Sequence, residues 1–261
     1  MKRELNDISV NYEIFGNDGP WVVLSHSLMC DLTMWGPQID VLKADYRVLA
    51  YDTRGHGGTD APDGEYTLDE LASDAYELLA ALDIHKPHWV GLSMGGMIGM
   101  TAALNYPNLF SSLVLCDTTS RIPEEMHSAW KDRIRVSQEK GMAFLVSSTL
   151  ERWFTDDFRA EPRPELRFVS NLIESTPVAG FVGCCHAIPK INCTSRLHEI
   201  KEPIKIIVGK EDVGTPVKMS EEIHAASRES SLTVLDNASH LSNLEQPQQF
   251  NEALLSFLST N

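Results

Sequence analysis

Ser93 is the residue of this 261-residue chain with the clearest potential for covalent chemistry. It lies within Gly91-Leu92-Ser93-Met94-Gly95-Gly96, directly after an apolar run at 88–92 and before an expected helix from Met97. Glycines two positions before and two positions after a serine permit a tight strand-to-helix turn that lifts the hydroxyl above a sheet. The turn also places the serine at a helix N-terminus, where developing negative charge is stabilised. The pattern therefore predicts a serine nucleophile.

A serine hydroxyl becomes a nucleophile only with a base and an acid that orients the base. Asp212 comes shortly after the apolar run 204–208, and His240 lies in the loop after the last such run. Open α/β sheets place their sites at the carboxyl ends of such strands. The order serine, acid, histidine along the chain is typical of folds in which the serine lies on a strand-to-helix turn. We expect Asp212 to be the acid, with Glu211 and Asp117 as the alternatives.

Acyl chemistry also needs hydrogen-bond donors for an oxyanion. The backbone N–H of Met94, next to the serine, is one expected donor. The other should come from the loop after the run 21–24, and we assign it to the N–H of Leu28. His26 is expected to belong to the framework of that loop. His56, in a turn rich in glycine, is expected to be structural.

These side chains need a sheet to bring them together, and the chain contains suitable strands. Short, mostly continuous apolar runs bounded by turn residues occur at 21–24, 48–51, 88–92, 113–116, 204–208 and 232–235. Such runs are typical of parallel strands covered on both faces. A helix is expected over 67–82, because Thr67 and Glu70 form a capping box. The alternation predicts a doubly wound, mostly parallel α/β sheet with helices on both faces. The alternating segment 9–15 predicts an antiparallel strand at the edge.

The segment 121–195 interrupts this alternation. It contains no buried-strand run and is expected to form helices at 123–139, 142–154 and 165–174. Its ten basic and ten acidic residues cancel, so the whole net charge of −15 falls on the rest of the chain. We therefore expect a core domain of residues 1–120 and 196–261, with residues 121–195 as a helical cap that supplies any counter-charge for an anionic ligand.

Composition and missing motifs exclude several other functions. A net charge of −15 disfavours binding to nucleic acid or to an anionic membrane. No phosphate-binding loop, dinucleotide fingerprint or metal-ligand spacing is present, so we expect no metal and no cofactor. The N-terminal residues lack the apolar stretch of a signal peptide, and the five cysteines form no C-x-x-C pair. We expect a cytoplasmic protein with reduced thiols and a small-molecule substrate. Homo-oligomerisation stays open.

The motifs resemble those of the α/β-hydrolase superfamily over essentially the whole chain. Within it, the chain looks most like the 3-oxoadipate enol-lactonases. The matching stretches are 24–28, 51–57, 91–97, 152–155, 183–185 and 238–243. The resemblance implies a cofactor-free hydrolase that opens a small enol-lactone bearing a carboxylate, as in the β-ketoadipate pathway of aromatic compound catabolism.

In the mechanism that the resemblance implies, Ser93 attacks the lactone carbonyl while His240 takes its proton and Asp212 holds the imidazole. Water then releases the acid from an acyl-enzyme. Trp130 and Arg133 are the candidates for binding the substrate carboxylate, because residues three apart share one face of a helix. Arg133 could equally be a solvated surface residue.

Three alternative functions remain compatible with the sequence. A carboxylesterase for small neutral esters would use the same serine machinery. A cofactor-free oxygenase of this fold would not need Ser93, and a ligand receptor would use the pocket with little turnover. Dehalogenases and epoxide hydrolases are disfavoured, because their nucleophile is an aspartate and position 93 is serine.

Overall fold

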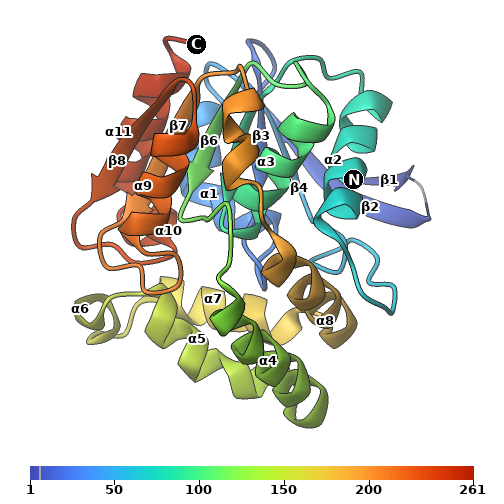
Figure 1. The fold of residues 1–261 in the computed structure, drawn as a ribbon, viewed down its shortest axis with the longest axis vertical. Coiled ribbons are helices and arrows are strands. Elements are labelled where there is room, and N and C mark those ends of the chain that lie inside the picture. Colours follow the sequence, from blue (N-terminus) through green and yellow to red (C-terminus); the bar gives the residue numbers. More distant parts are fainter. Residues whose placement is uncertain (6) are drawn as a thin grey trace.

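The computed structural model describes residues 1–5 and 7–261, which form one eight-stranded sheet in the order β1-β2-β4-β3-β5-β6-β7-β8 (Figure 1). The strands are β1 (Lys2–Leu5), β2 (Ile8–Phe15), β3 (Trp21–Ser25), β4 (Arg47–Tyr51), β5 (His88–Leu92), β6 (Ser112–Cys116), β7 (Ile204–Gly209) and β8 (Ser230–Leu235). β2 pairs antiparallel with β1 and with β4, and the pairs from β4 to β8 are all parallel. The expected mostly parallel sheet is therefore confirmed.

The edges of the sheet differ from the expectation. The edge strand is β1, so β2, which contains the segment 9–15, lies one position inside the sheet. β1 was not expected because its first three residues, Lys2, Arg3 and Glu4, are charged and exposed. Charged side chains are common on edge strands, where they discourage pairing with other chains. β8 forms the opposite edge and is largely half-exposed, so it lacks the cover on both faces that its apolar run suggests.

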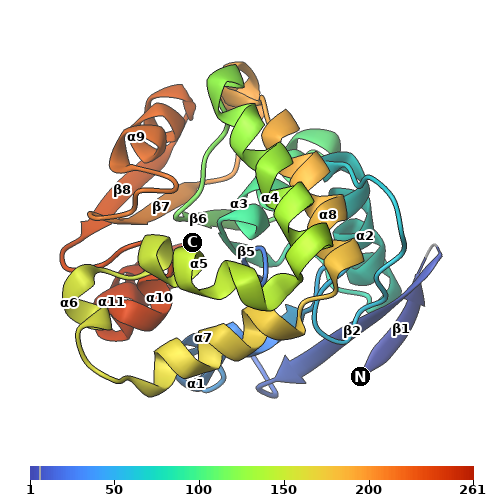
Figure 2. The same ribbon diagram turned by 90° about the horizontal axis from the view of Figure 1, so that it is seen from below.

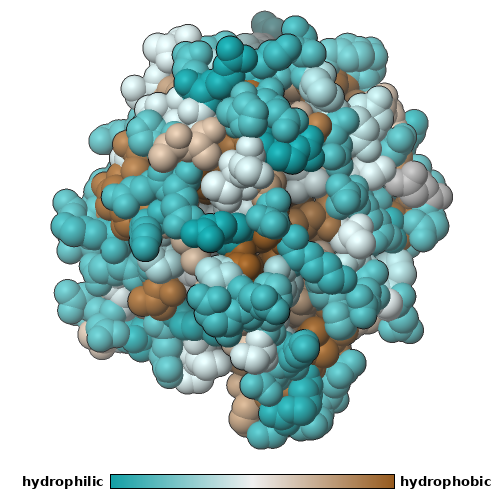
Figure 3. Space-filling model, in the orientation of Figure 1, coloured by the Kyte–Doolittle hydropathy of each residue, from teal (hydrophilic) through white to brown (hydrophobic). Residues whose placement is uncertain are grey.

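Helices cover both faces of the sheet (Figure 2). On one face α2 (Leu68–Ala81) packs against α3 (Met94–Asn105), and α9 (Val217–Ala226) packs on β7 and β8. On the other face α1 (Gly36–Leu42) packs against α10 (Ser242–Glu245) and α11 (Pro247–Leu258). α2 begins at the expected cap, where the Thr67 side chain accepts the N–H of Glu70. Polar side chains cover the face shown in Figure 3, with apolar ones in small separate patches.

Five α-helices of the described chain come between β6 and β7 and lie beyond the carboxyl ends of the strands (Figure 1). They are α4 (His127–Lys140), α5 (Val146–Trp153), α6 (Asp156–Arg159), α7 (Pro164–Ser175) and α8 (Val178–Ala187). The division into a core and a cap at residues 121 and 195 stays a prediction. Among the described residues, no single helix is long and apolar enough to cross a membrane. One pair of helices, Pro164–Ser175 and Val178–Lys190, is long and apolar enough only when the two are taken together, and the pair is bent by 91°.

α8 was not among the expected helices, because its two glycines weaken the helical pattern. The structure explains one of them through tertiary packing. A Cβ at Gly180 would lie 2.0 Å from the carbonyl oxygen of Gly55, so only glycine allows α8 to approach the 52–57 turn this closely. α8 therefore packs directly on the core, and α4 packs against α8.

Candidate active site

Ser93 occupies the sharp turn between β5 and α3. Its φ of 54° and ψ of −111° are unusual for a residue with a side chain, and such strain is typical of functional turns. A Cβ at Gly91 would lie 2.2 Å from the carbonyl oxygen of Gly95, and a Cβ at Gly95 would lie 2.1 Å from that of Ser25. Both flanking glycines are therefore required by close backbone contacts. The second contact also holds the end of β3 against the start of α3.

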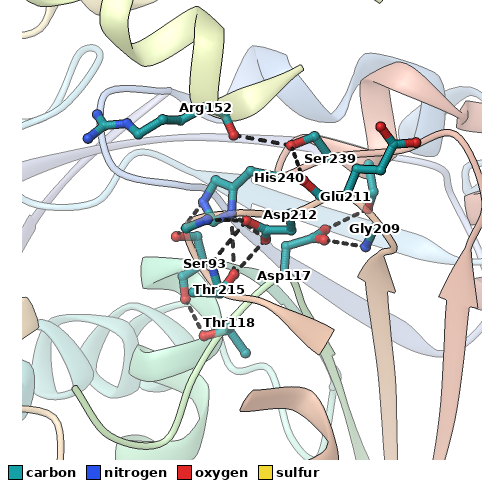
Figure 4. Close-up of polar contacts among 12 residues, drawn as sticks. Ser93, Asp117, Thr118, Arg152, Gly209, Glu211, Asp212, Thr215, Ser239 and His240 are labelled. Atoms are coloured by element: carbon teal, nitrogen blue, oxygen red, sulfur yellow. Dashed lines mark hydrogen bonds and ion pairs between the residues drawn. The ribbon is translucent and has the colours of Figure 1, made fainter. Parts of the chain in front are cut away.

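His240 connects Ser93 to Asp212 (Figure 4). Its Nε2 lies 3.0 Å from Ser93 Oγ, and its Nδ1 lies 2.7 Å from Asp212 Oδ2. An ionised carboxylate only accepts hydrogen bonds, so Nδ1–H donates to Asp212 and Nε2 is left to accept the Ser93 hydroxyl. This arrangement can move a proton from a serine hydroxyl to a histidine.

Asp212, rather than Glu211 or Asp117, meets the histidine. The N–H groups of Gly214 and Thr215 donate to Asp212 Oδ1, and the Thr215 hydroxyl donates to Oδ2 at 2.6 Å. Burial alone would raise the pKa of Asp212, but His240 and these hydrogen bonds lower it below the ordinary aspartate value. The carboxylate is therefore ionised at neutral pH. The Glu211 side chain is exposed to solvent.

Asp117 lies fully buried at the end of β6. It accepts hydrogen bonds from the Gly209 N–H at 2.8 Å and from the Ser242 hydroxyl at 2.5 Å, and makes none with His240. Burial and the nearby charge of Asp212 raise its pKa well above the ordinary aspartate value. Asp117 therefore acts as a structural group that joins β6, β7 and α10.

The backbone around Leu28 favours an oxyanion site. The Ser27 N–H donates to the Met34 sulfur and the Met29 N–H donates to His56 Nε2 at 3.0 Å. Within the described chain, the N–H groups of Leu28 and Met94 have no protein acceptor. Leu28 lines the same cavity as Ser93, and Met94 directly follows Ser93 in the chain.

His26 and His56 hold this loop, in line with the framework roles expected for them. His26 Nδ1 lies 2.7 Å from the Ser27 carbonyl, and its Nε2 accepts the Thr53 N–H at 2.9 Å. The two imidazole rings lie 5.2 Å apart. Burial lowers the pKa of both, that of His56 to about 3, so both are neutral and can accept backbone hydrogen bonds.

Hydrogen bonds join the loop that carries His240 to the segment after α5, and this connection was not predicted from the sequence. Glu245 accepts the Ser239 N–H at 2.8 Å and both the N–H and the hydroxyl of Thr155, at 2.9 and 2.5 Å. The Leu241 N–H donates to the Trp153 carbonyl at 3.1 Å. No motif points to Glu245, because its role depends on a contact between residues 90 positions apart.

A cavity of about 190 Å³ opens beside Ser93 and His240. It is smaller than the roughly 300–1,000 Å³ typical of sites for drug-sized ligands, which suits a small substrate. Its lining is mostly apolar, with two arginines and, among the described residues, no carboxylate. The lining includes Leu28, Met97, Ile122, Trp130, Arg133, Arg152, Trp153, Ile188, Thr215 and Met219.

The structure brings Trp130 and Arg133 together in this lining. The Arg133 guanidinium lies 4.9 Å from the centre of the Trp130 ring and 5.5 Å from that of Phe181. Its Nε is buried and has no hydrogen-bond partner, so Arg133 is not a solvated surface residue. Burial and, to a lesser degree, the charge of Arg152 lower the pKa of Arg133 to about 10, so the group remains charged at neutral pH.

Within the described residues, no three histidine, cysteine or acidic side chains are grouped so as to hold a metal ion. All five cysteines are buried free thiols. Hydroxyl, imidazole and guanidinium groups supply the polar part of the cavity lining, from Ser27, Ser93, Thr119, Arg133, Arg152, Thr215 and His240.

Known proteins are similar to this chain in sequence and in fold. A family model described as alpha/beta hydrolase fold matches residues 20–247. A 3-oxoadipate enol-lactonase of Acinetobacter baylyi is 35% identical over 250 residues, which cover 95% of this chain and 92% of the relative. The crystal structure of the enol-lactonase from Burkholderia xenovorans LB400 has a TM-score of 0.95 at 33% identity, covering 99% of this chain and 100% of that chain. A hydrolase from Pseudomonas aeruginosa PA01 also has a TM-score of 0.95 at 33% identity, with coverage of 99% and 97%.

Proposed function

Because this chain belongs to the alpha/beta hydrolase fold family and is similar to 3-oxoadipate enol-lactonases over most of its length, we propose that it opens a small enol-lactone bearing a carboxylate, such as 3-oxoadipate enol-lactone. Ser93 is the proposed nucleophile, with His240 as base and Asp212 as the acid that orients it. The enol-lactonases to which the chain is similar, together with its hydrolase fold, support hydrolysis of a lactone or ester.

The first half-reaction follows from the contacts of Ser93. Its hydroxyl passes its proton to His240 Nε2, 3.0 Å away, as the oxygen attacks the lactone carbonyl. Asp212 stabilises the imidazolium through the 2.7 Å contact at Nδ1. The N–H groups of Met94 and Leu28 bind the oxyanion. Collapse of the tetrahedral intermediate breaks the ring C–O bond, and His240 returns the proton to the leaving enol oxygen.

The second half-reaction releases the product. His240 takes a proton from water, which attacks the acyl-enzyme, and the Ser93 hydroxyl is restored as the acid departs. The enol that was formed by ring opening can tautomerise to a ketone. This tautomerisation removes the group that would close the ring again, so the net reaction is effectively irreversible.

One observation carries the choice of an anionic lactone over a neutral ester. Arg133 lines the cavity, its Nε is buried without a hydrogen-bond partner, and it makes no ion pair among the described residues. A half-buried cation without a counter-charge is unfavourable, and a substrate carboxylate would neutralise it. The same guanidinium also lies 4.9 Å from the centre of the Trp130 ring.

The test compares 3-oxoadipate enol-lactone with a small neutral ester such as p-nitrophenyl acetate. We expect the lactone to have the higher kcat/KM, and Ser93→Ala to lose roughly 10⁴- to 10⁶-fold with both substrates. Arg133→Gln should lower kcat/KM roughly 10- to 100-fold for the lactone only. Arg135→Gln is the matched control, since Arg135 lies on the same helix, is exposed, and pairs with Glu139.

Two outcomes would point elsewhere. A preference of wild-type protein for the neutral ester, with no effect of Arg133→Gln, would support a carboxylesterase instead. Turnover that survives Ser93→Ala would exclude the serine mechanism altogether and favour chemistry that does not use this hydroxyl.

A further inference from the structure

A second guanidinium lines the same cavity. Arg152 lies in the last turn of α5 and borders the cavity together with Ser93 and His240. Among the described residues, its guanidinium makes no ion pair and no hydrogen bond, although the chain as a whole carries a net charge of −15. The cavity therefore gathers two unpaired cations in a strongly acidic protein.

The two cations disfavour each other's charged form. Burial lowers the pKa of Arg152, and the charge of Arg152 contributes to the lowered pKa of Arg133. Holding two like charges in a partly buried site is unfavourable unless anions offset them. One substrate carboxylate accounts for a single cation, so the second still needs a partner.

The position of Arg152 indicates which anion it meets. The Ser239 hydroxyl donates to the Arg152 carbonyl at 3.1 Å, and the ring of the next residue, Trp153, lies 6.0 Å from the His240 ring. Figure 4 shows the Arg152 side chain on the cap side of His240, reaching away from Asp212. The backbone of Arg152 thus lies beside the loop that carries His240, and its side chain lines the same cavity as Ser93. Arg133 lines that cavity from a different helix, α4, with its guanidinium 4.9 Å from the Trp130 ring and 5.5 Å from the Phe181 ring.

Hydrolysis creates a negative charge near Ser93. A lactone that bears one carboxylate enters as a monoanion. Water adds to the acyl carbon, the bond to Ser93 Oγ breaks, and the released acid loses its proton at neutral pH, so the product is a dianion. We propose that Arg152 binds the carboxylate released from Ser93 while Arg133 binds the one that the substrate brings, which makes the cavity a two-point site for short aliphatic dicarboxylates. This inference rests on the proposed function, because that function supplies the dianion.

Calorimetric titration with adipate and hexanoate tests the proposal without turnover. These acids have six carbons each and differ in the second carboxylate. We expect wild-type protein to bind adipate at least about tenfold more tightly, since each charge-assisted hydrogen bond is roughly twice as strong as a neutral one. Arg152→Gln should abolish this preference while changing the Kd of hexanoate less than about twofold. Arg133→Gln should weaken both ligands.

Two controls exclude a general structural effect. Arg135→Gln removes an exposed charge from α4 and should leave both Kd values unchanged. Arg152→Lys keeps the cation and should restore part of the preference for adipate, whereas a loss of folding in Arg152→Gln would not be rescued selectively for one ligand.

The proposal is overturned if wild-type protein does not prefer adipate, or if Arg152→Gln leaves that preference intact. It is also overturned if Arg152→Gln weakens adipate and hexanoate equally, since both arginines would then grip a single carboxylate. Failure of the proposed function gives a different result. In that case the lactone is a poor substrate, while adipate still binds in a manner that depends on Arg152.

Discussion

The buried pair of histidines behind the oxyanion loop should make the protein lose stability in mild acid. His56 accepts the Met29 N–H through Nε2 at 3.0 Å, and its Nδ1 lies 3.3 Å from the Arg54 carbonyl. Nε2 can accept the Met29 N–H only in a neutral ring, because a protonated imidazole has no acceptor, and the proton of that neutral ring then lies on Nδ1, facing the Arg54 carbonyl. Burial lowers the pKa of His56 from 6.5 to about 3.

The size of the effect follows from proton linkage. Below pH 6.5 the unfolded chain binds a proton at His56 that the folded protein does not bind until about pH 3. The stabilising contribution of the neutral ring is therefore complete above pH 6.5 and is lost as the pH falls. At about 1.36 kcal/mol per pH unit, some 1.5 units of acidification, to pH 5, remove about 2 kcal/mol. His26, whose pKa is also lowered by burial, acts in the same direction.

Urea unfolding of wild-type protein and His56→Gln between pH 7.5 and pH 5 measures this contribution. Glutamine keeps an oxygen that can accept the Met29 N–H but does not titrate. We expect wild-type protein to lose about 2 kcal/mol more than the variant over this range, because other titrating groups act equally in both. Equal pH slopes for the two proteins, or an NMR titration of His56 near pH 6.5, would refute the reasoning.

Two further predictions concern the acid and the nucleophile turn. Asp212→Asn should lower kcat for ester hydrolysis roughly 10⁴-fold, because the His240 imidazole loses its correct tautomer. Asp117→Asn should retain activity to within about tenfold. Steady-state kinetics of the two variants distinguish these roles. Gly95→Ala should lower the free energy of unfolding by about 1–3 kcal/mol, because the new Cβ would lie 2.1 Å from a backbone carbonyl oxygen. Gly36→Ala is the control. Its Cβ would have no atom within 4 Å, so the free energy of unfolding should change by less than about 0.5 kcal/mol.

Local sequence patterns were enough to predict the parallel strands, the Ser93 turn and the order of the three reacting residues. Each of these depends on neighbours in the chain. Apolar runs indicate buried strands, and the glycines around Ser93 are needed for contacts within and beside one turn. The sheet then brings strand ends together, so the convergence of Ser93, Asp212 and His240 follows from the topology once the strands are recognised.

Only the tertiary structure decided between Asp212 and its competitors, and it alone revealed Glu245 and Arg152. Adjacent residues such as Glu211 and Asp212 face different surroundings, and their side-chain directions depend on the course of the loop after β7. Whether a charge is paired, neutralised or left for a ligand depends on groups contributed by distant segments, as Thr155 does for Glu245. The sequence therefore determines which chemistry is available. The packing of distant segments decides which charged groups are left to bind a substrate, because electrostatic free energies depend on burial and on neighbours in space rather than along the chain.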